Sequence, residues 1–365
     1  YEELKALFQE ADRRYNSGLF DLAEDQFARG ISVDAGVLIS IFEELYLPRS
    51  PFDFSVVETQ VLGKIYEQFL GRRVRLGDGR DVTIEEKPEV AASAGVVPTP
   101  PYVADEIVAR TLGPLLAKKS PGDLTDFEVC DICCGSGSFL LSAYEFLSNH
   151  YREWYLSDGP ENHPEKIYEA AQGMWHLSLE EKRRIALQHI YGVDKDAEAT
   201  EVARLSLLLK VIENETPEAV EAHLEREGEG ALPDLRANVK QGNSLLDETY
   251  FDFDSDALTD ADVYAELQPF EWSDAFPEVM SRGGFDAIIG NPPYVRIQNM
   301  VRYIPRETSY FQSSVAPYET VTKQSIDAYF IFIERALSLL KPEGLLGYIV
   351  PHKFFTIDAG KSLRR

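Results

Sequence analysis

The stretch that decides the fold is Phe127-Glu128-Val129-Cys130-Asp131-Ile132-Cys133-Cys134-Gly135-Ser136-Gly137-Ser138-Phe139. Its first seven residues form an apolar run that predicts a buried strand, and the apolar residues from 139 to 147 predict the helix that follows. Between them, Gly135 and Gly137 lack a Cβ, so a ligand can approach the backbone closely. Asp131 ends the strand and is suited to pair with an ammonium group. This order predicts a nucleoside-cofactor loop, with a plain tight turn as the alternative because the third glycine of G-x-G-x-x-G is missing.

The alternation of strands and helices continues along the chain. Further strands are predicted at 190–193, 239–241, 285–289 and 345–350, and helices are predicted after Asp194 through Leu209 and over 329–340. Strands that alternate with helices form a parallel sheet with crossover connections. Polar motifs follow the strand ends, which is the edge where open α/β sheets bind ligands. The sequence therefore predicts an α/β fold with its site at the carboxyl edge of the sheet.

Five other segments precede or interrupt this alternation. Residues 1–70 carry apolar residues at helical spacing, including a helix over 57–69 that ends at Gly71, and residues 74–86 predict a short hairpin around Gly77-Asp78-Gly79. Residues 148–187 predict a polar, helical insertion, and residues 213–236 and 247–281 are acidic connectors.

Two short motifs follow the second and third predicted strands. Asp194, in Gly192-Val193-Asp194-Lys195-Asp196, is placed to accept hydrogen bonds from ribose hydroxyls. The alternative is that Asp194 or Asp196 caps the next helix. Gly242-Asn243-Ser244 offers polar groups that suit an adenine edge, although by itself it is a turn.

The most informative motif is Asn291-Pro292-Pro293-Tyr294, directly after the apolar strand that ends at Gly290. A planar amine such as that of adenine is a poor nucleophile because its lone pair is delocalised into the ring. The Asn291 side-chain oxygen and the Pro292 carbonyl can each accept one N–H, which moves the nitrogen toward sp³ geometry. The prolines fix φ and orient that carbonyl, and Tyr294 offers a face on which a base can stack. A base that reaches such a pocket must leave the duplex. The structural alternative is a Pro-Pro turn with a packed tyrosine.

Composition limits the classes of protein that this chain can be. It has 365 residues and 44% hydrophobic residues, with no apolar run long enough to span a membrane and no signal-like start, which predicts a cytoplasmic protein. The three cysteines, Cys130, Cys133 and Cys134, have no matching Cys/His pair, so we expect buried thiols and no metal. The formal charge of −26 is uneven: residues 291–365 hold ten Lys/Arg against six Asp/Glu, or +4, which leaves −30 for residues 1–290. The less acidic end is therefore the expected DNA-facing surface.

The order of these motifs resembles the gamma class of N6-adenine DNA methyltransferases. Thr99-Pro100-Pro101-Tyr102 precedes the Asp131 motif, Asn291-Pro292-Pro293-Tyr294 follows it, and Asp327-Ala328-Tyr329 leads to the last predicted strand. The resemblance covers residues 95–365, and Leu62-Gly63-Lys64-Ile65-Tyr66-Glu67 is similar to the modification half of type IIG restriction–modification or related phage-defence enzymes.

The resemblance implies a Rossmann-like S-adenosylmethionine-dependent methyltransferase sheet with helices on both faces, preceded by a helical N-terminal segment. Residues 1–95 would form that segment with its hairpin, and residues 96–365 the catalytic domain, without its last strands and target-recognition domain. The implied partners are double-stranded DNA and other defence-system or specificity subunits, with no membrane. The implied cofactor-binding residues are Thr99, Tyr102, Asp131, Cys133, Gly135, Gly137, Asp194, Lys195, Asn243 and Ser244, and the implied catalytic residues are Asn291, Pro292, Pro293 and Tyr294.

The sequence departs from the family pattern in two places and leaves other functions open. Ile132-Cys133 replaces the usual Pro-Ala, and Asn243 stands where Asp is common. The same catalytic quartet serves enzymes that methylate protein glutamine or an amine of ribosomal RNA, while cytosine-N4 enzymes more often carry Ser at position 291. A non-catalytic, cofactor-binding subunit is the alternative of a different class.

Overall fold

A computed structural model describes residues 2–15, 33–46, 48–50, 72–76, 82–86, 99–216, 220–223, 232–322, 327–356, 360 and 363. The helix expected over 57–69 with its cap at Gly71, and the turn Gly77-Asp78-Gly79, lie outside the described residues.

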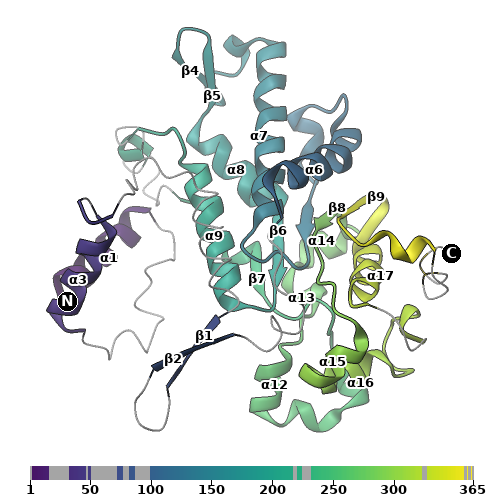
Figure 1. Ribbon diagram of the computed structural model, residues 1–365. Coiled ribbons are helices and arrows are strands. Elements are labelled where there is room, and N and C mark those ends of the chain that lie inside the picture. The colour runs from purple at the N-terminus through teal and green to yellow at the C-terminus, as the bar shows by residue number, and fades with distance from the viewer. Residues whose placement is uncertain are drawn as a thin grey trace.

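A five-stranded parallel sheet forms the centre of the molecule (Figure 1). Its strand order is β7-β6-β3-β8-β9, so β3, which comes first in the sequence among these five strands, lies in the middle. Because the chain adds β6 and β7 on one side of β3 and β8 and β9 on the other, the order reverses between β3 and β8. The strands span Val129–Asp131 (β3), Ile190–Asp194 (β6), Val239–Gln241 (β7), Phe285–Gly290 (β8) and Leu340–Tyr348 (β9). The predicted parallel α/β sheet is confirmed.

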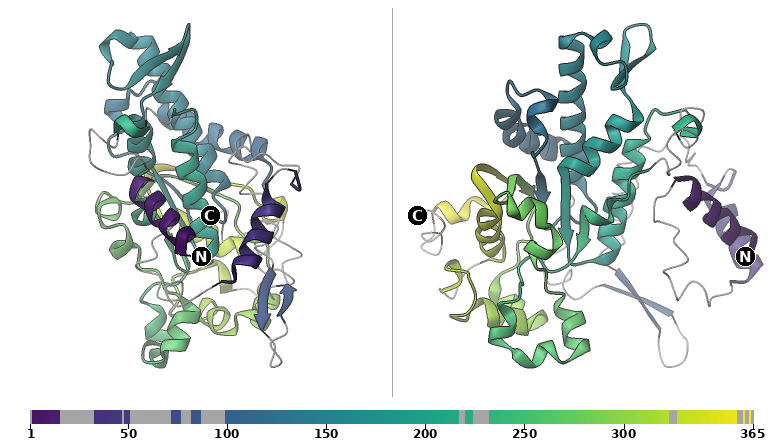
Figure 2. Two further views of the ribbon diagram at one scale, coloured as in Figure 1. Left: turned by 90° about the vertical axis from the view of Figure 1, so that its left-hand side faces the viewer. Right: turned by 180° about the vertical axis from the view of Figure 1, so that it is seen from behind.

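Helices cover both faces of this sheet, as predicted (Figure 2). Side chains of adjacent strand residues point to opposite faces, so Val129 packs in one core and Cys130 in the other. The first core is shared with α6 (Pro101–Leu116), α7 (Ser138–Asp158), α8 (Leu179–His189) and α9 (Ala197–Val211). The second core is shared with α13 (Trp272–Ala275), α14 (Pro277–Ser281) and α17 (Tyr329–Leu339).

A separate group of short helices, which we call the helical lobe, has its own apolar core. It lies below the sheet in Figure 1, where α12, α15 and α16 are labelled. Its core includes Tyr250, Leu267, Tyr310 and Phe311, all at most 2% exposed. Its α-helices are α11 (Tyr250–Phe253), α12 (Ala261–Leu267), α15 (Ile297–Tyr303) and α16 (Pro305–Phe311). The predicted connector 247–281 is thus partly helical, and it supplies both this lobe and two sheet-covering helices.

The structure corrects two other predicted segments. The insertion at 148–187 is not wholly helical: α7 continues to Asp158, and an antiparallel hairpin of β4 (Ile167–Ala171) and β5 (Met174–Leu177) follows. The exposed residues of β4 carry no regular alternation that would have marked a strand. Residues 341–344, which separate the predicted helix 329–340 from the predicted strand 345–350, lie inside β9, where the register shifts and Glu343 adopts φ 69°. The strand begins before this irregularity, since Leu340 and Leu345 on its two sides pair with Phe285 and Ala287 of β8.

The N-terminal part contains helices and a hairpin, as predicted. The described elements are α1 (Glu2–Tyr15), α3 (Ala35–Leu45) and the antiparallel strands β1 (Arg72–Leu76) and β2 (Val82–Glu86). Among the described helices, none is both long and apolar enough to cross a lipid bilayer.

The contact between α6 and β9 tests this packing. A Cβ at Gly347 would lie 2.1 Å from Thr111 Oγ1 of α6, whereas one at Gly113 on the same helix would meet only Phe146, at 3.9 Å. We expect Gly347→Ala to lower the free energy of unfolding by about 1–3 kcal/mol through overpacking. The control, Gly113→Ala, should leave it unchanged or raise it by up to about 1 kcal/mol, since alanine favours a helix. Urea unfolding measures both, and equal effects would contradict the packing described.

Candidate functional site

The candidate site lies at the carboxyl edge of the sheet, where β3 and β8 are neighbours and the strand order reverses. Asp131 ends β3 and is 1% exposed, and Gly290 ends β8. A Cβ on Gly290 would lie 2.7 Å from Asp131 Oδ1, so only glycine lets the two strand ends approach this closely. This contact brings the loop after Asp131 and the quartet that begins at Asn291 together.

The glycine loop after β3 has the geometry that its sequence predicts. Gly135 and Gly137 have φ values of 51° and 89°, in the left-handed region that favours glycine. A Cβ on Gly137 would lie 3.0 Å from the Ala203 Cβ, so this residue also permits α7 to begin directly against α9. The Cys133 N–H donates to Asp131 Oδ1 at 3.0 Å, which orients the carboxylate within the loop.

Asp194 connects this loop to the end of β6. Its Oδ2 accepts the Gly135 N–H at 2.8 Å and its Oδ1 accepts the Asp196 N–H at 2.9 Å. The helix cap is Asp196, whose side chain accepts the Glu198 N–H at 3.0 Å. The alternative in which Asp194 caps α9 is therefore wrong, and each Asp194 oxygen keeps a lone pair for a ligand.

Burial sets the electrostatics of these two carboxylates. It raises the pKa of Asp131 to about 7, and the neighbouring Asp194 charge adds to that shift while the Cys133 N–H opposes it. Burial also raises the pKa of Asp194. Burial and the two acids raise the pKa of the Cys133 thiol, which keeps it neutral. Two like charges in a buried site favour a cationic ligand.

Lys195, Asn243 and Ser244 surround the outer part of the same edge. Lys195 Nζ donates to Glu307 Oε1 of α16 at 3.0 Å, so this side chain joins the Asp194 loop to the helical lobe. Asn243 Oδ1 accepts the Leu245 N–H at 3.2 Å, which closes the turn after β7. Ser244 is 5% exposed, and its carbonyl accepts the Trp272 indole N–H at 3.3 Å.

The quartet Asn291-Pro292-Pro293-Tyr294 extends β8 into the site. Asn291 Nδ2 donates to Thr99 Oγ1 at 3.1 Å, which leaves Oδ1 as the amide's acceptor toward Tyr294. The Tyr294 hydroxyl lies 2.5 Å from Asn291 Oδ1 and 2.6 Å from the Ile349 carbonyl after β9. Burial raises the pKa of Tyr294 to about 12, so this hydroxyl remains a donor at neutral pH.

The remaining predicted residues differ in exposure. Pro292 is buried, Pro293 is exposed, and Tyr294 is 37% exposed. Tyr102 is 75% exposed in the first turn of α6. The structure thus gathers the predicted motifs at one edge, with Tyr102 at its solvent side.

Sequence reasoning missed three participants at this edge. The one sequence signal for Gly290 is that it is a glycine at the end of an apolar strand, directly before Asn291. Glu307 is a single acid within a polar helix, 1% exposed, and nothing in its spacing pointed to Lys195. The third participant is the backbone carbonyl of Ile349, and the identity of a side chain gives no sign of what its backbone carbonyl contacts.

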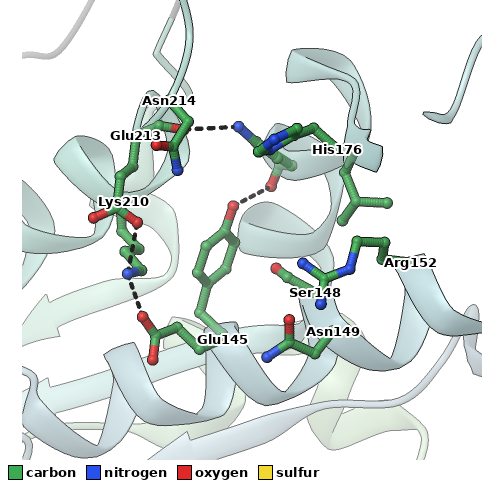
Figure 3. Close-up of a pocket in the computed structure, with 11 residues that line it drawn as sticks. Glu145, Ser148, Asn149, Arg152, His176, Lys210, Glu213 and Asn214 are labelled. Carbon is green, nitrogen blue, oxygen red and sulfur yellow. Dashed lines mark hydrogen bonds and ion pairs between the residues drawn. The ribbon is translucent and has the colours of Figure 1, made fainter. Parts of the chain in front are cut away.

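A cavity of about 260 Å³ lies between α7, β5 and the end of α9 (Figure 3). Its lysines are already paired within the wall: Lys210 with Glu145 and Glu213, and Lys182 with Glu215. It lies along the part of α7 from Tyr144 to Arg152, whereas the candidate site borders the first turn of that helix. The predicted motifs converge at the carboxyl edge of the sheet and not at this cavity.

Comparisons with known proteins agree with this geometry. The family "N-6 DNA Methylase" matches residues 57–229, and the family "Eco57I restriction-modification methylase" matches residues 188–365. The Escherichia coli type II restriction enzyme and methyltransferase RM.Eco57I is 34% identical over 365 residues, which is 100% of this chain and 34% of that protein. Together the two family matches cover residues 57–365, so the chain is similar to DNA methylases over most of its length.

Two further similarities extend this result. The adenine-specific methyltransferase PglX of Streptomyces coelicolor is 24% identical over 279 residues, covering 73% of this chain and 20% of that protein. The DNA-bound structure of the ATP-dependent type ISP restriction-modification enzyme LlaBIII has a TM-score of 0.50 at 16% identity and covers 92% of this chain and 19% of that one. The likeness to LlaBIII supports the fold. This chain spans between 19% and 34% of the length of these three proteins.

The raised pKa of Asp131 predicts a measurable loss of stability. A carboxyl whose folded pKa lies near 7, above its ordinary value, destabilises the fold progressively as pH rises toward 7, by about 1.4 kcal/mol per pH unit between the two values. Asp131→Asn removes the charge and keeps an acceptor for Cys133. We expect it to raise the urea midpoint more at pH 8 than at pH 5, whereas the exposed control Asp274→Asn should change little at either pH. An equal gain at both pH values would contradict this cause.

Proposed function

We propose that this chain carries out methyl transfer from S-adenosylmethionine to the N6 amine of adenine in DNA, in the cytoplasm and within a restriction–modification or phage-defence system. The proposal rests on the matches to the two DNA methylase families and on one geometric observation. The Asn291 amide donates its N–H to Thr99 and thereby directs Oδ1 toward the Tyr294 hydroxyl. An acceptor fixed in that direction, one residue beyond β8, suits a planar amine substrate.

The residues of the quartet then have separate tasks. Asn291 Oδ1 and the Pro292 carbonyl each accept one N–H of the amine, which concentrates its lone pair on nitrogen. The Tyr294 hydroxyl lies where one of those N–H groups would donate, so the tyrosine ring must turn as a base arrives. Its ring is then free to stack on the base. Positioning and electrostatics supply the catalysis, since the reaction needs no strong base in the site.

The residues at the strand ends fit S-adenosylmethionine, which supplies an electrophilic methyl group on its sulfonium when bound. We propose that Asp131, with Thr99, binds the ammonium end, because it is a buried carboxylate beside a second acid. Asp194 would accept ribose hydroxyls through its two remaining lone pairs. Backbone groups of Cys133, Gly135 and Gly137 would line the methionine end.

We also propose places for the residues in the outer part of the site. Asn243 and Ser244 would lie at the cofactor adenine, and Tyr102 at the open side of the site. Lys195 would lie beside Asp194, the acid that binds the ribose. Specificity or defence subunits are proposed as partners in addition to double-stranded DNA, and residues 1–95 and 96–365 as the two domains.

The direct test of the proposed reaction uses isotope-labelled S-adenosylmethionine, unmethylated DNA and mass spectrometry of the digested nucleosides. We expect label in N6-methyladenosine, and we expect Asn291→Ala to reduce turnover at least 100-fold because a preorganised acceptor is lost. Cofactor binding by Asn291→Ala should stay within a few-fold of the parent. Label in protein, RNA or N4-methylcytosine would redirect the substrate assignment, and unaltered function of Asn291→Ala would indicate a cofactor-binding scaffold.

Thr99 offers a second, independent test of the amide geometry. Thr99→Val keeps the shape but removes the hydroxyl that accepts from Asn291 Nδ2. We expect kcat to fall about tenfold, the equivalent of one hydrogen bond, with the KM for the cofactor changed less. Thr99→Ser keeps the acceptor and should restore kcat. A rise in that KM with kcat unchanged would instead indicate that Thr99 acts through the cofactor alone.

A further inference from the structure

Two loops beside the catalytic quartet contrast with the acidity of the whole chain. Residues 291–306, which follow β8, contain three arginines and no acid, and residues 349–357, which follow β9, contain Lys353 and no acid. The chain as a whole carries a formal charge of −26. A polyanion therefore meets repulsion over most of this protein and much less at these loops.

The sheet places these two loops next to each other. β8 and β9 are parallel neighbours, with Gly290 paired to Tyr348, so the segments that leave them start side by side. The Tyr294 hydroxyl then joins them through its 2.6 Å contact with the Ile349 carbonyl. Arg296 follows Tyr294 by two residues and Lys353 follows Ile349 by four. Their Cα atoms thus lie within about 7 Å and 14 Å of those two residues along the chain.

The cations of these loops are exposed and available. Arg296 is the residue before α15, Arg302 lies in its last turn, and Lys353 belongs to the short 3₁₀ helix His352–Phe355. All three side chains are exposed. Among the ion pairs that the described residues form, none includes one of these three side chains.

Other cations of the same region are paired, and this contrast singles out the three. Arg306 contacts Asp254 at 3.1 Å, Arg335 contacts Asp247 at 2.8 Å, and Lys195 contacts Glu307 at 3.0 Å. Those cations connect parts of the fold. One acid, Asp327, lies beside Arg296, because the two residues form a β-bridge through their backbones.

We propose that Arg296, Arg302 and Lys353, which we call the cationic rim, bind backbone phosphates of duplex DNA on either side of the base taken up by the quartet. The inference rests on the proposed function and adds the surface that positions its substrate. Contacts to phosphates fix the register of a protein on DNA without reading its sequence. A base turned out toward Asn291 needs its flanking phosphates fixed within reach of that side chain.

The experiment measures the affinity of the full chain for a fluorescent 20–30 base-pair duplex over a range of salt concentrations. Each phosphate contact contributes about 0.9 to the slope of log K against log salt. We expect Arg296→Ala, Arg302→Ala and Lys353→Ala each to lower the slope by about 0.9, and the triple variant by about 2.7. Arg296→Lys should retain the parent slope, because a phosphate accepts either cation.

The matched control is Arg236→Ala, which removes one exposed positive charge from the turn before β7, at the amino edge of the sheet. It should leave the slope unchanged. Cofactor binding by each variant checks that the variant is folded. We expect all of them to bind the cofactor, because none of the three rim side chains packs in a core.

The outcomes separate the rim from the proposed function. Parent protein that methylates DNA while the triple variant keeps the parent slope would overturn the rim and leave the function standing. Parent protein that binds cofactor but shows no salt-dependent affinity for duplex DNA would overturn both the rim and the DNA substrate. Slope losses confined to the rim variants would support the proposal.

Discussion

The arrangement of the site depends on the close contact between the ends of β3 and β8. Gly290 leaves no side chain between the strands, and its hypothetical Cβ would lie 2.7 Å from Asp131 Oδ1. Because β3 is central, the loops after β6 and β8 reach it from its two sides. The acid that suits a cationic ligand and the amide that suits an amine therefore meet without any long connecting loop. A larger residue at position 290 would separate the two halves of the site.

The amino edge of the sheet contributes to stability, whereas the carboxyl edge carries the candidate site. At the amino edge, Lys341 Nζ donates to Glu128 Oε2 at 2.8 Å and to Asp286 Oδ2 at 2.7 Å, so one cation joins the starts of β3, β8 and β9. At the carboxyl edge, Asp131 is buried and Asp194 is half-buried, and the raised pKa values of both acids record an unfavourable environment for their charges. The ion pairs at the amino edge stabilise the fold, which can therefore accommodate acids without a cationic partner at the carboxyl edge. Perturbed carboxyls of this kind gather at functional sites.

The sequence predicted the sheet and the motifs well because each depends on local signals. Apolar strands and the polar residues at their ends are visible without knowledge of the fold, and the five strands of the sheet lie close to where they were expected. Features that depend on distant partners were not visible. The β4–β5 hairpin exposes most residues of β4, and the irregular start of β9 carries a Lys-Pro-Glu-Gly segment that reads as a turn. Glu307 is polar and fully buried only because Lys195 meets it from 112 residues away.

Tyr294 shows how one side chain can serve two states of the same pocket. Its single O–H can donate to one of two acceptors at a time, Asn291 Oδ1 at 2.5 Å or the Ile349 carbonyl at 2.6 Å. An acceptor that loses its donor costs free energy, so the hydroxyl stabilises the quartet before any base arrives. In the proposed reaction, the incoming amine replaces the hydroxyl at Asn291 Oδ1 and donates its second N–H to the Pro292 carbonyl. The exchange favours a substrate with two amine hydrogens over one with a single donor. The resting contact therefore contributes to selection for an N–H₂ group, in addition to holding the quartet in place.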